Sequence, residues 1–287
     1  MKRLGVPAFQ ELELFDACVS EMEEMERAAF VESRPHMQAV AEAFATESTS
    51  QTWCRLQKAR HGHAEDIVAG SLSKGTLTDL YSISVVKSKG RPRNIYDKIL
   101  VAAEGKCPYC AGIGAAETLD HYLPKARFPA LSVHPLNLVP ACYTCNKGAG
   151  ADFPVSPSLQ PIHPYLDKDC FFSERWIHAK VIPSQPVVVI FQANPPDDWS
   201  IADQRRARQH FKGCDLGNRF SIQVAGEIGP LIRQRKSSLA VFSRDQFAAH
   251  LRVVAEDNDL LLNGWKRTMY LALCESDWFC SVDFDGF

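Results

Sequence analysis

Apolar residues in the first third of the chain recur at three- and four-residue steps. The clearest run extends from Leu12 to Ala29 and lies among many glutamates. That period is typical of a helix with one buried face and one solvated face. Because proline lacks an amide hydrogen and blocks the preceding turn, we expect Pro35 to end the first helix. The helices expected here are Phe9 to Pro35, Met37–Thr46 and Ser50–His61, the last with Trp53 and Leu56 in the core.

A basic segment follows the short apolar stretch Tyr81 to Val86. Its sequence, Lys87-Ser-Lys-Gly-Arg-Pro-Arg93, contains a glycine and a proline. These two residues disfavour a regular helix, so we expect the basic side chains to lie on an extended loop. The segment is either a solvated linker or a contact for a phosphate backbone. A short helix is expected to resume over Tyr96 to Ala103.

The last third predicts a β-hairpin followed by helices. Two β-rich runs, Trp176–Ile182 and Val187–Gln192, flank the turn sequence Pro-Ser-Gln-Pro. Ser200 is expected to cap a helix that reaches Cys214 and carries an arginine-rich polar face. The aromatic tail Ser276–Phe287 is expected to pack on its own domain, with a partner-docking strip as the alternative. Further helices are expected at Gly226–Ser237, Arg244–Asp257 and Leu260–Cys274, which gives a mostly helical α+β protein.

Length and composition set the broad class. A chain of 287 residues with 46% hydrophobic and 23% charged residues is ordinary for a globular protein. No apolar run approaches the roughly 20 residues that span a bilayer, and the acidic, amphipathic N-terminus does not resemble a signal peptide. We therefore expect a cytoplasmic protein without a membrane partner. The expected regions are 1–86, which is helical, 87–165, a cysteine-containing module, and 166–287, the C-terminal α+β region.

The charge is distributed unevenly. The net charge is −2, yet the stretch from Lys87 to Gly150 carries nine Lys/Arg against four acids, a local charge of +5. The remainder of the chain therefore carries −7. A local basic patch matters more to phosphate binding than the whole-chain charge. The acidic flanks are poor candidates for wrapping DNA and are expected to dock a partner or to cover the module.

The module contains four of the ten cysteines in two C-x-x-C pairs. Cys107 and Cys110 form the first pair, Cys142 and Cys145 form the second, and 31 residues separate the pairs. Each pair can present two sulfurs to one tetrahedral ion, so the pattern predicts a structural Zn²⁺ site. The zinc would stabilise a segment too small to have a core of its own. A thioredoxin-like dithiol would need one such pair rather than two.

Polar residues between and after these pairs have the chemistry of phosphodiester hydrolysis. That reaction needs a base near neutral pH and a cation beside the scissile phosphate. His121 suits the first task, because its ordinary pKa is near neutrality. Asp120 and Asn146 carry the oxygen ligands that hard Mg²⁺ prefers, and such ligands do not compete with sulfur for zinc.

In residue type, order and spacing, Asp120-His121, Asn137 and Asn146 directly after Cys145 resemble the HNH (ββα-metal) nucleases, many of which have a four-cysteine zinc site. The resemblance covers about residues 100–150 and implies a DNA endonuclease with a catalytic Mg²⁺ or Mn²⁺. It implies that His121 is the general base, that Asp120 and Asn146 bind the catalytic metal, and that Asn137 holds the loop that orients His121. The final histidine of the family name is Asn146 here, as in many members.

The wider sequence resembles HNH proteins of bacterial anti-phage defence, including the nuclease subunits of Septu-type and retron-associated systems. The stretches that carry this likeness are Asp-His-Tyr-Leu-Pro-Lys, Asn-Leu-Val-Pro and Ile162-His163-Pro-Tyr165-Leu-Asp167. It implies an ATPase partner. His163 would complete the metal site or contact phosphate, or else pack beneath the module, whereas His134 is expected to be structural. The candidate contacts to nucleic acid are Lys87, Lys89, Arg91, Arg93, Lys125, Arg127, Lys147 and His163.

Two questions stay open at this level. Neighbouring residues of a regular strand point to opposite faces, so Asp120 and His121 cannot both address one phosphate from an ideal strand. Either the strand is distorted or ends there, or Asp120 faces the metal while His121 reaches around it. The alternative function is a nonenzymatic zinc-stabilised nucleic-acid-binding or adaptor protein, which leaves the Asp-His and Asn residues unexplained.

Overall fold

A computed structural model describes residues 1–284, except for the side chain of Ala149. It confirms the α+β class, since the helices are accompanied by small antiparallel hairpins. The chain divides into two compact units, which are described separately below. No helix within residues 1–284 is long and apolar enough to cross a lipid bilayer. The larger unit comprises Arg3–Tyr109 and Gly114–Asp167, and the smaller comprises Met1–Lys2, Cys110–Ile113 and Lys168–Phe287.

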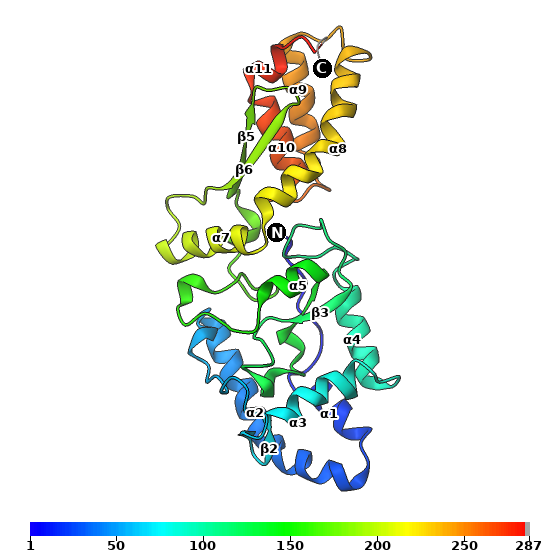
Figure 1. Cartoon of the computed structure of the whole chain (residues 1–287), viewed down its shortest axis with the longest axis vertical. Coiled ribbons are helices and arrows are strands. Elements are labelled where there is room, and N and C mark those ends of the chain that lie inside the picture. The colour runs from blue at the N-terminus through cyan, green and yellow to red at the C-terminus, as the bar shows by residue number, and fades with distance from the viewer. Residues whose placement is uncertain (285–287) are drawn as a thin grey trace. The chain divides into compact units, whose positions relative to one another are not determined.

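The larger unit packs helices around the hairpin of β3 and β4 (Figure 1). Its core includes Phe15, Leu77 and Ile99, each at most 1% exposed. The predicted amphipathic helix is present, but it is divided into α1 and α2. The elements of this unit are α1 Glu13–Ser20, α2 Glu24–Thr49, β1 Ile67–Ala69, β2 Leu72–Ser73, α3 Lys74–Asp79, the π-helical turn Leu80–Val85, α4 Arg91–Val101, β3 Thr118–His121, β4 Leu138–Ala141 and α5 Tyr143–Ala149, with 3-10 turns at Trp53–Arg55, Pro129–Leu131, Pro135–Asn137 and Pro157–Leu159.

The prediction that Pro35 ends a helix is wrong. Pro35 lies inside α2, which runs without a break from Glu24 to Thr49. A proline in a helix leaves the carbonyl four residues earlier without its amide partner. That carbonyl belongs to Val31, and both residues are exposed, so water can satisfy the oxygen. The helix can therefore continue through this position.

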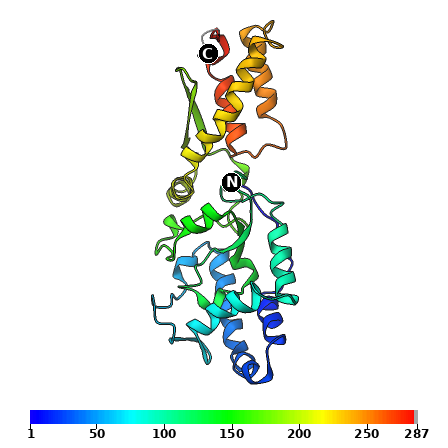
Figure 2. The ribbon, with the colours of Figure 1, turned by 45° about the vertical axis from the view of Figure 1, so that its right-hand side comes forward.

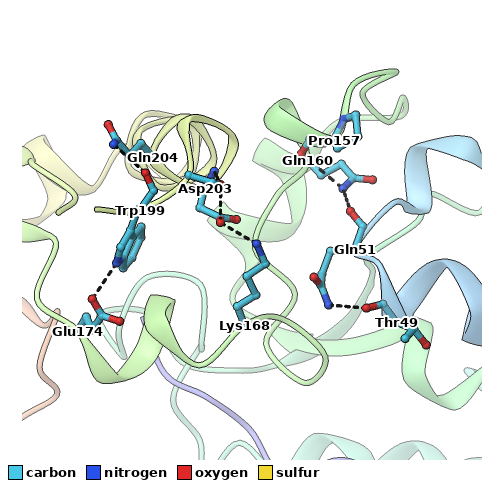
Figure 3. Close-up of polar contacts among 10 residues, drawn as sticks. Thr49, Gln51, Pro157, Gln160, Lys168, Glu174, Trp199, Asp203 and Gln204 are labelled. Carbon is cyan, nitrogen blue, oxygen red and sulfur yellow. Dashed lines mark hydrogen bonds and ion pairs between the residues drawn. The ribbon is translucent and has the colours of Figure 1, made fainter. Parts of the chain in front are cut away.

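The helix expected over Ser50–His61 is also wrong. Only the 3-10 turn Trp53–Arg55 forms there, although Trp53 is fully buried as expected. The buried side chain of Gln160 accepts a hydrogen bond from the Cys54 amide (2.6 Å) and donates one to the Gln51 carbonyl (2.7 Å; Figure 3). These backbone groups are therefore bound to a residue more than 100 positions away in sequence, rather than to each other.

The basic loop is shorter than expected, because α4 begins at Arg91. Pro92 lies in the first helical turn, where a missing amide hydrogen costs nothing. The carboxylate of Glu21 accepts a hydrogen bond from the Arg91 amide (2.7 Å) and so caps the helix. The same carboxylate lies against Gly90 so closely that a Cβ atom there would meet it at 2.1 Å. Only Lys87 to Gly90 remain as a loop.

The smaller unit is the predicted hairpin with its helices (Figures 1 and 2). Strand β5 packs on α10 and β6 packs on α8. Ser200 caps α7 as expected, since its hydroxyl accepts a hydrogen bond from the Asp203 amide (3.1 Å). Helix α8 begins ten residues before the predicted position. It starts directly after Asp215, whose backbone is in the left-handed conformation. The elements are α6 Cys170–Ser173, β5 Ile177–Ile182, β6 Val188–Ala193, α7 Ile201–Gly213, α8 Leu216–Lys236, α9 Arg244–Ala255, α10 Trp265–Cys274 and α11 Asp277–Ser281.

The aromatic tail packs on its own unit as far as it is described. Phe279 is fully buried and Phe284 is 2% exposed, and their rings lie 5.3 Å apart. This supports the first of the two readings of the tail. Its last three residues, 285–287, lie outside the described residues.

Asn263 joins the loop before α10 to the start of β5. Its side-chain oxygen accepts hydrogen bonds from the amides of Trp176 (2.9 Å) and Ile177 (3.1 Å), and its amide group donates one to the Glu174 carbonyl (2.8 Å). The residue is 1% exposed. Removal of the Asn263 side chain would leave these buried backbone groups without hydrogen-bond partners. Asn263→Ala should therefore lower the free energy of unfolding by about 3 kcal/mol in denaturant titrations. The exposed Asn258→Ala is the control, and an equal loss in both variants would contradict the assignment.

Candidate metal and catalytic site

The four cysteines of the two C-x-x-C pairs form one buried cluster. The sulfur atoms of Cys107, Cys110, Cys142 and Cys145 all lie within 4.8 Å of one another. A tetrahedral zinc with Zn–S bonds near 2.3 Å places its sulfurs roughly 3.8 Å apart. The cluster therefore fits a structural Zn²⁺. Cys107 precedes β3, while Cys142 lies between β4 and α5.

Strands β3 and β4 are followed directly by α5, so the local order is strand, strand, helix (Figure 1). Asp120 pairs with Val139 and His121 pairs with Leu138 in an antiparallel register. Strand β3 ends at His121, which is one of the alternatives left open above. Asp120 and His121 are each 8% exposed. Asn146 lies half-buried in α5, and its side chain has no hydrogen-bond partner among the described residues.

His121 is held by the loop that joins the two strands. Its Nε2 lies 2.9 Å from the carbonyl oxygen of Ser132, and the edge of the ring contacts Tyr81 with centroids 4.4 Å apart. Burial lowers the pKa of His121 to about 4, with the hydrogen bond to Ser132 opposing the shift and the positive charge of Lys125 adding to it. The imidazole is therefore neutral at pH 7. Neither Tyr81 nor the Ser132 carbonyl was identified from the sequence, because neither forms part of a motif.

Asn137 braces the same loop and is completely buried. Its side-chain oxygen accepts a hydrogen bond from the Leu123 amide (2.7 Å). Its amide group donates to the carbonyls of Leu123 (3.1 Å) and Leu131 (3.0 Å). Leu131 precedes Ser132, so Asn137 fixes the backbone that receives the His121 hydrogen bond. These contacts agree with the loop-holding role that the resemblance implies.

Asp120 acts on two buried tyrosines. Burial is the main reason that the pKa values of Tyr81 and Tyr109 are raised, and the negative charge of Asp120 raises both further. Tyr109 lies inside the first C-x-x-C pair, and the charge of Cys107 also raises its pKa. The charge of Asp120 therefore acts both at the first C-x-x-C pair, through Tyr109, and at the Tyr81 ring that packs on His121.

The structure excludes His163 as a metal ligand or phosphate contact. It is completely buried, its Nε2 donates to the Leu136 carbonyl (3.1 Å), and its Nδ1 accepts from the Tyr165 amide (3.2 Å). Its ring stacks on Trp53. Both ring nitrogens are engaged, so this prediction is corrected to the packing role, which was the alternative. His134 is also buried, and neither ring nitrogen has a hydrogen-bond partner within residues 1–284, which agrees with a structural residue.

The predicted basic contacts differ in their surroundings. Lys125 is half-buried, donates to the Ser82 hydroxyl (2.8 Å) and lies over the Tyr81 ring. Burial lowers its pKa, which the negative charge of Asp79 opposes. Lys125 is thus the basic candidate that the structure brings to His121. The others are Arg91, paired with Glu13; Arg93, paired with Asp97; Arg127, whose Nε is 3.3 Å from Asp152; and Lys87, Lys89 and Lys147, which are exposed.

Removing one cysteine of the cluster should release the metal. Cys142→Ala leaves three sulfurs, so we expect the bound zinc to fall from one per chain toward none and the thermal midpoint to drop sharply. Metal analysis by mass spectrometry and a thermal melt measure both effects. Cys170→Ser, which lies outside the cluster, is the control. Full zinc occupancy in Cys142→Ala would show that the cluster does not hold the ion.

The buried His134 should make stability depend on pH. Burial lowers its pKa from 6.5 to about 4. Between these values the unfolded chain binds more protons, so the stabilisation is complete above about pH 6.5 and is lost as the pH falls toward 4. Denaturant titrations should show a loss of about 2 kcal/mol from this group between pH 7.5 and pH 5. His134→Leu should reduce the pH dependence by that amount, while the exposed His36→Ala should not. An unchanged profile in His134→Leu would refute this.

Comparison with known proteins finds a relative that aligns with nearly the whole chain. No protein-family model matches it, and no solved structure matches it. Protein ea31 of Escherichia phage lambda is 33% identical over 294 aligned positions, which cover 97% of this chain and 99% of the relative. The likeness therefore extends over both units and is not confined to the cysteine cluster. The chain belongs to the same family as protein ea31 of Escherichia phage lambda.

Proposed function

We propose that the chain is a metal-dependent endonuclease that hydrolyses DNA phosphodiester bonds, with His121 as the general base. The observation that carries the proposal is the hydrogen bond between His121 Nε2 and the Ser132 carbonyl. A carbonyl only accepts, so Nε2 must carry the hydrogen of the neutral ring. The lone pair is then on Nδ1, the nitrogen that can take a proton from water.

The surroundings of His121 Nδ1 support this role. It has no hydrogen-bond partner among the described residues, whereas Nε2 is bound to the Ser132 carbonyl. The residue as a whole is 8% exposed. A phosphate next to the ring would stabilise the imidazolium and raise the low pKa of His121 toward neutrality. The half-buried ammonium of Lys125 provides a positive charge for the same phosphate.

The oxygen ligands fit a hard divalent ion. Asp120 offers a carboxylate one residue before the base, and Asn146 offers an amide oxygen that no described residue uses. Such oxygens suit Mg²⁺ or Mn²⁺, whereas the zinc is expected at the softer sulfur ligands of the cysteines. When bound, the ion would neutralise charge on the phosphate and the leaving oxygen. Asn137 would keep the base in position through the loop.

The biological setting needs a separate proposal. The resemblance implies a nuclease of anti-phage defence that works with an ATPase, whereas ea31 is itself a protein of a phage. Membership of the ea31 family therefore favours neither a role in defence against phages nor a role in a phage. We keep the defence role and the ATPase partner as a proposal that the adjacent genes can test, separately from the chemistry.

Replacement of the base tests the proposed chemistry. With Mg²⁺ or Mn²⁺, the zinc-loaded protein should nick plasmid DNA and shorten linear DNA, and His121→Ala should lower the rate at least a hundredfold. The exposed His36→Ala is the matched control, because it removes an imidazole far from any motif. Cleavage that survives His121→Ala unchanged would refute His121 as the base. Metal-independent DNA binding without shorter products would instead favour the zinc-stabilised binding protein.

A further inference from the structure

Helix α7 of the smaller unit carries a buried face and an exposed face of different character. The buried side chains are Asp203, Arg206, Ala207 and His210, each at most 7% exposed. The exposed residues on the opposite side are Arg205, Arg208, Gln209 and Lys212. Their spacing of three and four residues places them on one side of the helix. We call Arg205, Arg208 and Lys212 the α7 basic stripe.

Contacts at its N-terminal end fix the orientation of α7 within the unit (Figure 3). Lys168 donates to the Asp203 carboxylate at 2.7 Å, and the Trp199 indole donates to Glu174 at 2.8 Å. Gln204 also donates to the Trp199 carbonyl at 3.1 Å. Since Asp203 is held inward, the stripe must point to solvent. A rigid element presents its charges with little loss of conformational freedom when it binds.

The stripe has no acidic partner among the described residues. Arg208 only contacts the neutral Gln204, and no ion pair involves Arg205 or Lys212. Exposed arginines elsewhere do have such partners, as Arg34 does with Asp16 at 2.7 Å. The one acid of α7, Asp203, is already paired with Lys168. The stripe is therefore a local excess of three positive charges in a part of the chain, residues 168–287, whose Lys/Arg and Asp/Glu are equal in number.

We infer that the α7 basic stripe of the smaller unit binds the phosphate backbone of DNA, as a contact surface separate from the cysteine module. The stripe runs over the eight residues from Arg205 to Lys212, or roughly 10 Å of helix axis. That length is enough for contacts with two or three phosphates. Guanidinium groups bind phosphate through paired hydrogen bonds, and the neighbouring Gln209 can donate as well. These contacts position a backbone and read no base sequence. The inference rests on the proposed function, because it names a surface for the same substrate.

The test compares two variants with the same change in charge. Arg205→Gln, Arg208→Gln and Lys212→Gln together remove the stripe. Lys180→Gln, Arg233→Gln and Arg252→Gln together remove three exposed charges that lie on β5, α8 and α9 of the same unit. Both sets are made in the full zinc-loaded chain with His121→Ala, in magnesium-free buffer. Affinity for a 30-base-pair duplex is measured by fluorescence anisotropy from 50 to 300 mM salt, and a single strand of RNA is a parallel arm.

Loss of three phosphate contacts should weaken duplex binding about tenfold or more at 100 mM salt and reduce the slope of log affinity against log salt by roughly 2–3. The scattered control should change both by much less. Equal losses in the two variants, an unchanged slope, or no DNA binding by the parent would overturn the inference, and binding of RNA alone would overturn its substrate. Because the assay measures binding, it is independent of cleavage. DNA binding by the stripe can therefore be confirmed even if the nuclease activity is refuted, and the nuclease activity can be confirmed even if binding by the stripe is refuted.

Discussion

The carboxamide of Asn137 makes three hydrogen bonds to the backbone of the β3–β4 connection, and the position of His121 depends on them. The connection runs from Tyr122 to Asn137 and contains only short 3-10 turns, so no regular ladder holds it. A side chain that both donates and accepts is needed, because one partner is an amide and the others are carbonyls. Aspartate would lack the donors, and leucine of similar size would lack both functions. Ser132, whose carbonyl receives the imidazole hydrogen, adjoins one of these contacts.

The cysteine cluster and the candidate catalytic groups share the same short elements. Strands of four residues and a helix of seven cannot form a core of their own. A metal bound to Cys107, Cys110, Cys142 and Cys145 would tie the segment before β3 to the start of α5. Asn146 follows the last cysteine, and Asp120 lies in the strand between the pairs. Removal of the zinc would therefore disturb the site through the backbone, although the two kinds of ligand select different ions.

The parts of the fold that the sequence predicts correctly depend on neighbouring residues. The β5–β6 hairpin, the Ser200 cap and the C-x-x-C pairs each have their signal within a few positions. The errors arise where distant residues intervene. Gln160 binds the backbone near Trp53, and Glu21 caps a helix that begins 70 positions later. The wrong helix end at Pro35 has a different cause, since Val31 and Pro35 are both exposed and water can satisfy the Val31 carbonyl.

The same limit applies to the histidines, where residue type alone does not define chemistry. Three buried histidines of the larger unit, His121, His134 and His163, differ in what their two ring nitrogens contact. His163 has both nitrogens engaged and can neither bind a metal nor take a proton without breaking a buried contact. His134 has neither engaged, yet both are sealed from solvent. His121 has Nε2 bound to a carbonyl, while no described residue binds its Nδ1. A general base needs a fixed ring and a defined tautomer with a free lone pair. Of these three histidines, His121 alone combines a held ring with a second nitrogen that no described residue binds, and its motif identified the residue but not this reason.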